Sequence, residues 1–132
     1  MGFKLNIILP QKKYSFIVDL LVATTDNGII GILSNHTPIY CYINISWMRL
    51  FQDGEENLWV INGGILTFEH NVCTITSEYV APISQINYDK ALQLEQESKL
   101  KYEQSKSKAE AINAQINLKI ATNLLQGKKI SK

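Results

Sequence analysis

The side chains best suited to chemistry in this 132-residue sequence are two histidines and two cysteines. His36 and His70 are the only histidines, and neither stands in an HExxH arrangement or at a spacing typical of zinc ligands. No serine has the G-x-S-x-G context of a hydrolase nucleophile. An enzyme needs acid, base or nucleophile groups that converge on one point. We therefore predict no catalytic residues, no cofactor and no metal site.

The closely spaced glycines also lack the context of a ligand-binding loop. Gly63 and Gly64 are not followed by the Lys and Ser or Thr of a phosphate-binding loop, and no helical pattern follows Gly28 and Gly31. Tight backbone turns, which glycine enters at little steric cost, explain both pairs better.

The cysteines, the net charge and the hydropathy exclude several classes of protein. Cys41 and Cys73 lie far apart in apolar, strand-like stretches, so we predict buried free thiols. A formal net charge of +1 creates no strong field for nucleic acid or an anionic membrane. No apolar run reaches the roughly 20 residues that span a bilayer. The first residues enter a strand pattern directly, so we expect no leader and no transmembrane segment.

Residues 1–86 have the pattern of a β domain. Phe3, Leu5 and Ile7 alternate with polar residues, the period of a half-buried strand. Frequent turn signals separate short apolar runs, which indicates a sandwich or small barrel built as an antiparallel meander. The other expected strands are Tyr14–Thr24, Ile29–Leu33, Ile39–Ile45, Trp47–Phe51, Leu58–Ile61, Ile65–Phe68, Val72–Thr76 and Val80–Ile86.

Residues 87–132 have the composition of two helices. Asn87 is suited to cap the first helix, and Ser107 with Glu110 fits the capping box of a second. Gly127 is expected to end the second helix. An apolar stripe on that helix must meet the first helix, the β domain or a partner, because a short helix pair buries little by itself. The stripe consists of Ala109, Ile112, Ile116, Ile120 and Leu124.

Several of these segments resemble one family in order along the whole chain. Thr25–Ile39 resembles the Gly-x-x-Gly-[Ile/Val]-Leu-x-x-His-x-Pro segment of the epsilon subunit of F-type ATP synthases. Asn62–Ile65 and Asn71–Ile75 resemble its Gly-Gly strand and its Asn-x-Val-Thr-Ile return. Ile86–Ala91 resembles the entry to its helices, and Ala114–Ala121 is similar to a run of plastid and cyanobacterial members.

The resemblance implies an N-terminal ten-stranded β-sandwich and a C-terminal antiparallel two-helix hairpin. It implies a non-catalytic rotor subunit in the central stalk, bound to the gamma subunit and to the membrane-embedded c-ring. The helices of this family can also contact the beta subunits and inhibit ATP hydrolysis.

Site residues follow from the same resemblance. The turn residues Asn27, Gly28 and Ile29 match the c-ring contact, although Ile29 replaces a usual polar residue. The gamma-subunit contact matches His36, Pro38 and Ile39. The charged residues of the helical region are most simply interpreted as a face exposed to solvent. The alternative is that its lysines contact an acidic segment of a partner. The candidate regulatory residues are then Lys106, Lys108 and Lys119.

Two residues at the start of the helical region depart from the pattern of ATP-binding family members. Asn87 and Lys90 replace an Asp and an Arg through which some bacterial members bind ATP. Lys lacks the bidentate fork of Arg, so we expect no ATP binding.

The alternative function is a stand-alone β-sandwich module that binds a peptide or sugar, and a metal enzyme using His36 and His70 is a distant third. The resemblance implies the stromal side of the plastid thylakoid membrane, with the cytoplasmic side of a bacterial inner membrane as the alternative.

Overall fold

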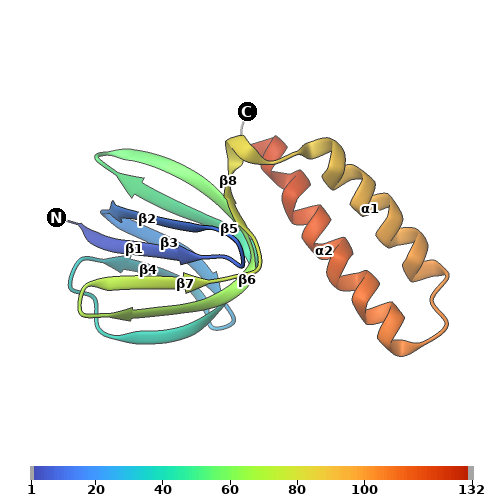
Figure 1. The fold of residues 1–132 in the computed structure, drawn as a ribbon, viewed down its shortest axis with the longest axis horizontal. Coiled ribbons are helices and arrows are strands. Elements are labelled where there is room, and N and C mark those ends of the chain that lie inside the picture. Colours follow the sequence, from blue (N-terminus) through green and yellow to red (C-terminus); the bar gives the residue numbers. More distant parts are fainter. Residues whose placement is uncertain (1, 131–132) are drawn as a thin grey trace. The chain divides into compact units, whose positions relative to one another are not determined.

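The computed structural model describes the backbone of residues 2–130 and the side chains of residues 2–126. The chain forms two compact units, Met1–Ile83 and Ser84–Lys132. The first unit contains the strands and the second the two helices (Figure 1). The strands are β1 (Phe3–Ile8), β2 (Lys13–Val18), β3 (Leu20–Thr25), β4 (Gly28–Leu33), β5 (Ile39–Gln52), β6 (Glu55–Glu69), β7 (Val72–Thr76) and β8 (Val80–Pro82).

The described residues form eight strands rather than the ten that the resemblance implies. Compared with the strands expected from the sequence pattern, β5 and β6 each run without a break through two predicted strands. Their ladder is interrupted only opposite Gly63, whose φ of 83° is left-handed. The first half of β6 pairs with β8 and its second half pairs with β7, so this one strand has different neighbours along its length. Figure 1 shows both long strands curving around the core.

The predicted strand Tyr14–Thr24 is divided at Asp19 into β2 and β3. The Asp19 backbone N–H donates to the Phe51 carbonyl at 2.7 Å, and its carboxylate accepts from the Asp53 N–H at 2.9 Å. These bonds let the chain change partners, since β2 pairs with β1 while β3 pairs with β4 and β5. The sheet order is β2-β1-β7-β6-β5-β3-β4, with β8 on β6.

The predicted antiparallel meander is wrong in one respect, because β1 pairs in parallel with β7, about seventy positions later in the chain. This pairing joins the β1–β2 pair to the rest of the sheet, and the strands share a single core. Every strand contributes buried side chains to it, and Phe3 meets Phe68 edge to face at 5.4 Å. The alternation predicted at Phe3, Leu5 and Ile7 is confirmed, since all three are buried.

The last strand is shorter than predicted. β8 ends at Pro82 and a 3-10 turn, η1 (Ile83–Gln85), replaces the rest of the expected strand. Proline has no N–H to continue the ladder, which accounts for the end of the strand at this position.

The two helices are α1 (Tyr88–Glu103) and α2 (Lys108–Ile130), and they pack against one another. Both predicted caps are confirmed: Asn87 Oδ1 accepts from the Lys90 N–H at 3.1 Å, and Ser107 Oγ accepts from the Glu110 N–H at 3.1 Å. The predicted stop at Gly127 is wrong, because α2 continues to Ile130. A single glycine costs a helix only about 1 kcal/mol, too little to end it by itself.

The buried positions described on the helix pair are four small residues and Asn123. Ala91 and Ser98 on α1 are seven positions apart, as are Ala114 and Ala121 on α2, so each pair lies on one face of its helix. The predicted apolar stripe is not this face. Ile112 and Ile116 are 45% and 47% exposed, which leaves the first half of the stripe accessible to a partner.

Candidate contact surfaces

The turn between β3 and β4 is held by the buried side chain of Thr25. Its hydroxyl donates to the Gly28 carbonyl at 2.7 Å and accepts from the Asn27 N–H at 3.2 Å. Gly28 has φ 112°, a left-handed conformation that a side chain rarely adopts. Ile29 follows and is 74% exposed, the largest fraction among the exposed large hydrophobic side chains described. The structure therefore brings Asn27, Gly28 and Ile29 together on one rigid, exposed turn.

The loop after β4 carries His36 and Pro38. The His36 N–H donates to the Leu33 carbonyl at 3.1 Å, and its ring lies edge-on to Phe68 at 5.8 Å. Its Nδ1 donates to the Thr37 carbonyl at 2.6 Å, because a carbonyl can only accept. Half-buried His36 thus belongs to an ordered loop, with exposed Pro38 beside it.

Strand β4 connects these two segments. The turn at Asn27–Ile29 lies at its start and the loop at Ser34–Pro38 follows its end. Six residues at about 3.4 Å per step separate the ends of the strand by about 17 Å. The predicted contact residues therefore form two separate surfaces rather than one.

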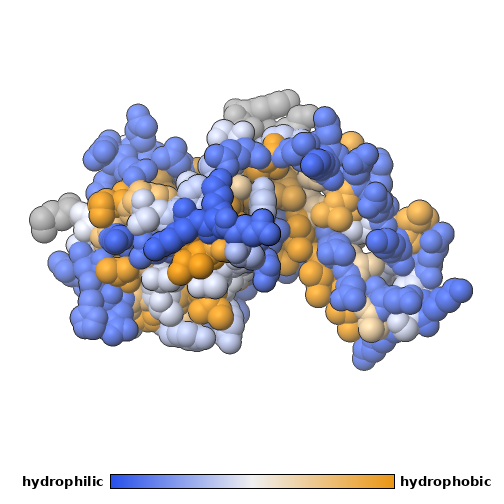
Figure 2. All heavy atoms as spheres, in the orientation of Figure 1, coloured by the Kyte–Doolittle hydropathy of each residue, from blue (hydrophilic) through white to orange (hydrophobic). Residues whose placement is uncertain are grey.

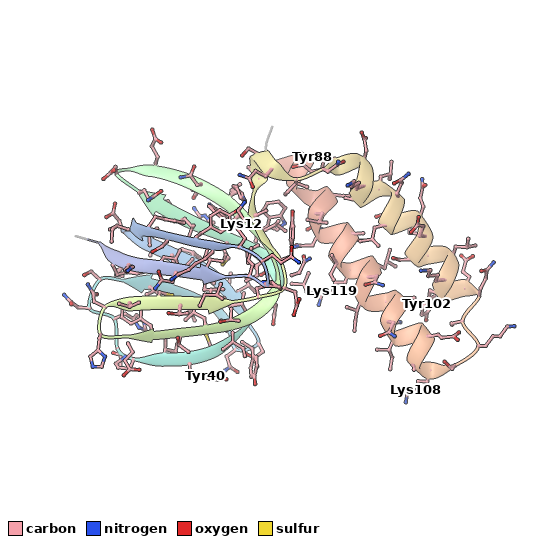
Figure 3. The ribbon with its side chains drawn as sticks, viewed as in Figure 1. Lys12, Tyr40, Tyr88, Tyr102, Lys108 and Lys119 are labelled. Carbon is pink, nitrogen blue, oxygen red and sulfur yellow. The ribbon has the colours of Figure 1, made fainter. Side chains whose placement is uncertain are left out.

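Sequence reasoning missed two aromatic residues that continue the second surface. Tyr40, which is labelled in Figure 3, and Tyr42 lie on β5 and are 64% and 56% exposed. Their ring centroids lie 6.2 Å apart. They lie on the same face because they alternate with Cys41. The alternation was visible in the sequence, but it did not show which face would be covered. Half-buried Ile39 precedes the pair.

The predicted lysines of the helical unit do not all lie on a helix. Lys106 belongs to the connection between the helices, whereas Lys108 begins α2 and Lys119 lies in its middle (Figure 3). Eleven residues are close to three helical turns, so Lys108 and Lys119 share a face. Exposed Ile112 and Ile116 lie between them in the sequence. Figure 2 shows hydrophobic side chains interspersed with hydrophilic ones on the helices.

The two thiols are free, as predicted, but the predicted burial holds only for Cys73 and is wrong for Cys41, which is half-buried. Burial, with a smaller effect of Cys41, raises the pKa of Cys73 to about 12. Partial burial, with a smaller effect of Asp26, also raises the pKa of Cys41. A raised thiol pKa means less thiolate at neutral pH and therefore low reactivity.

The remaining chemical candidates stay dispersed. His70 has a side chain that is 88% exposed, and it lies 3.4 Å from Glu69. Within residues 2–126, no group of three or more His, Cys, Asp or Glu side chains is placed to hold a metal ion. Over the described part of the chain, no helix is long and apolar enough to cross a membrane.

The fold and these surfaces define a class of protein that acts through contact with partners. Apolar and aromatic side chains are exposed on ordered segments of the sandwich and on the helix pair. Comparison with known proteins identifies the family. Residues 2–82 match the family described as ATP synthase, Delta/Epsilon chain, beta-sandwich domain.

Named relatives agree with this family. The chain is 32% identical to the ATP synthase epsilon chain of Caldicellulosiruptor bescii, over 77% of this chain and 75% of the relative. It is 28% identical to the chloroplastic ATP synthase epsilon chain of Guillardia theta, over 96% and 97% of the two chains. A chain in the Euglena gracilis mitochondrial ATP synthase OSCP/F1/c-ring structure shares the fold, with TM-score 0.80, 21% identity and coverage of 96% and 81%.

The chain belongs to the ATP synthase delta/epsilon family. The predicted resemblance to the epsilon subunit of F-type ATP synthases is confirmed, and with it the expectation of a non-catalytic subunit. The alternative of a stand-alone peptide- or sugar-binding module finds no support in these relatives.

Proposed function

We propose that this chain is a rotor subunit of the central stalk, which couples rotation of the c-ring to the catalytic head through the gamma subunit. The observation that carries this proposal is the family match over the sandwich, residues 2–82, which includes both ordered contact segments at the ends of β4. A subunit that transmits torque needs contact residues fixed on rigid elements. Both segments meet that need through hydrogen bonds to the sandwich.

The first proposed contact is the turn Asn27, Gly28 and Ile29 against the polar loops of the c-ring. Thr25 fixes this turn, and the exposed backbone around Gly28 is free to approach a partner closely. Exposed Ile29 adds an apolar contact where members of the family usually carry a polar residue. Burial of such a side chain contributes roughly 1.5–3 kcal/mol to an interface.

The second proposed contact, with the gamma subunit, uses His36, Pro38 and Ile39. We extend it to Tyr40 and Tyr42, because these exposed rings follow directly on β5. Tyrosine is enriched among the residues that dominate protein interfaces, where it combines apolar area with a hydrogen-bonding tip.

For the helical unit, we propose an antiparallel hairpin that contacts acidic segments of the beta subunits and restrains ATP hydrolysis. Lys108 and Lys119 would meet carboxylates, Ile112 would supply apolar contact beside them, and Lys106 would act from the connecting segment. Lysine is a point charge without the fork of arginine, so each such contact is weaker and less directional than in arginine-bearing relatives.

The proposed location is the peripheral, stromal side of the plastid thylakoid membrane, in line with the full-length similarity to the chloroplastic relative. The cytoplasmic side of a bacterial inner membrane is the alternative, favoured by the bacterial relatives. Fractionation of the source cells distinguishes the two, because only the first location places the chain with thylakoids.

A binding titration with the gamma subunit of the same synthase tests the proposal. Tyr42→Ala should weaken binding by roughly five-fold or more, the loss typical of a central interface residue. His70→Ala, which removes an exposed ring outside the proposed contact, should bind as tightly as the parent chain. Equal affinity of all three chains would exclude β5 from the gamma contact. Removal of residues 88–132 should leave gamma binding intact and raise ATP hydrolysis.

A further inference from the structure

One side chain connects three distant parts of the sandwich. Asn71 lies in the turn between β6 and β7, and its Oδ1 accepts from the Asn35 N–H at 2.7 Å and from Ser34 Oγ at 3.4 Å. Its Nδ2 donates to the Gly2 carbonyl at 3.4 Å, and its own carbonyl accepts from the Lys4 N–H at 3.3 Å. The loop after β4 is thereby tied to the start of β1 and to the β6–β7 turn.

The shortest of these bonds is the one to the loop. A donor–acceptor distance of 2.7 Å lies at the short end of the range for an N–H···O bond. Asn35 has φ 63°, a left-handed conformation that Asn tolerates better than most residues and that contacts with the surroundings stabilise. The bond to Asn71 supplies such a restraint one residue before His36.

Asparagine suits this position for two separate reasons. Asn71 has φ 61°, and Asn tolerates the left-handed region better than most residues. Its side-chain amide also offers an acceptor for the loop and a donor for Gly2 at the same time. Glycine would adopt the left-handed conformation but would offer neither the acceptor nor the donor. Aspartate would keep the acceptor for the loop and lose the donor to Gly2.

We propose that Asn71 is a positioning residue, which holds the Ser34–Pro38 loop in the conformation that meets the gamma subunit. The choice of the gamma subunit as the partner rests on the proposed function, whereas the role of Asn71 in holding the loop does not. Asn71 is only half-buried and lies in a different turn, so its effect on binding passes through Asn35 and His36. A loop ordered before it binds loses less conformational entropy on binding than a loose one.

The test uses the full chain labelled with ¹⁵N, with hydrogen exchange at the Asn35 amide and affinity for the gamma subunit as readouts. Asn71→Gly removes the side chain and keeps the backbone conformation. It should speed Asn35 exchange by about five- to ten-fold through loss of the hydrogen bond. It should also weaken gamma binding about three- to ten-fold through the added cost of ordering the loop.

Two variants control for other effects. His70→Gly places a glycine at the neighbouring left-handed position, φ 51°, where the exposed ring contacts only Glu69 among the interactions described. It should change neither readout. Asn71→Asp retains the acceptor and should restore both readouts to within about two-fold of the parent, because a carboxylate accepts the same loop bonds.

The inference is overturned if Asn71→Gly leaves Asn35 exchange unchanged, or if Asn71→Asp behaves like Asn71→Gly. It is also overturned if Asn71→Gly speeds Asn35 exchange but leaves the affinity for the gamma subunit unchanged, while His36→Ala lowers that affinity. Failure of the proposed function is recognised separately. In that case His36→Ala binds gamma as tightly as the parent chain, while Asn35 exchange still decides whether Asn71 holds the loop.

Discussion

Replacement of Thr25 by valine should loosen the turn proposed to meet the c-ring. Valine has nearly the same shape as threonine and fits the buried site, where Thr25 is 4% exposed. The substitution removes one donor and one acceptor: the 2.7 Å bond to the Gly28 carbonyl and the 3.2 Å bond from the Asn27 N–H. Both orphaned groups belong to exposed residues, so water can replace part of what is lost.

The expected cost follows from these two bonds. A hydrogen bond within a protein contributes about 0.5–1.5 kcal/mol net, so two contribute about 1–3 kcal/mol. The added methyl group of valine returns up to about 0.8 kcal/mol by burial. The net loss is therefore about 1–2 kcal/mol, which lowers the Tm of a domain of this size by roughly 5–15 °C.

Urea denaturation followed by tryptophan fluorescence measures this cost, since Trp47 and Trp59 both lie in the sandwich. Thr24→Val is the matched control, because Thr24 points to the opposite face of β3 and should change stability by less than about 0.5 kcal/mol. If Thr25→Val and Thr24→Val unfold at the same urea concentration, the hydroxyl of Thr25 does not hold the turn.

Three further predictions concern the rest of the chain. Gly64→Ala should destabilise the sandwich by about 2 kcal/mol or more in thermal melts, because its Cβ would lie 2.5 Å from a backbone carbonyl of β7. Gly31→Ala, which meets only a leucine methyl at 3.7 Å, should be neutral or slightly stabilising, and an equal loss in both would refute the steric reason. Asn87→Ala should cost α1 about 1 kcal/mol through loss of its cap, seen as reduced helicity by circular dichroism. Iodoacetamide at pH 8 should modify Cys41 before Cys73. Because folding raises the pKa of the Cys73 thiol from 9.0 to about 12, the free energy of unfolding should fall as the pH rises between these two values.

Local sequence rules predicted the features that depend on neighbouring residues. The alternation of β1, the turn at Gly28 and the caps at Asn87 and Ser107 all follow from interactions within a few positions. Local patterns also predicted the order of the two units, whereas the family came from the resemblance, which no local rule contains.

Features that depend on distant pairing were not predictable in the same way. The division of β2 from β3 depends on Asp19 bonding to Phe51 and Asp53, more than thirty positions later. Strands β5 and β6 stay paired with each other on both sides of Gly63, while the other neighbour of β6 changes from β8 to β7. Periodicity could not reveal either change.

The candidate site shows the same limit. The resemblance indicated His36 and Pro38, and the structure adds Tyr40 and Tyr42 because it shows which face of β5 is exposed. Asn71 lies 36 positions from Asn35, so only the folded chain brings the two together.

The two proposed contacts are fixed independently at opposite ends of one strand, and this has a measurable consequence. Thr25 holds the turn before β4, and Asn71 holds the loop after it, with about 17 Å of hydrogen-bonded strand between the ends. Sites this far apart without a shared partner have additive effects to within about 0.5 kcal/mol. The stability losses of Thr25→Val and Asn71→Gly should therefore add in the double variant, while c-ring binding responds to the first and gamma binding to the second. A larger coupling between the two would mean that β4 shifts as a whole when either end is released, and that the sandwich does not act as the rigid link that torque transmission requires.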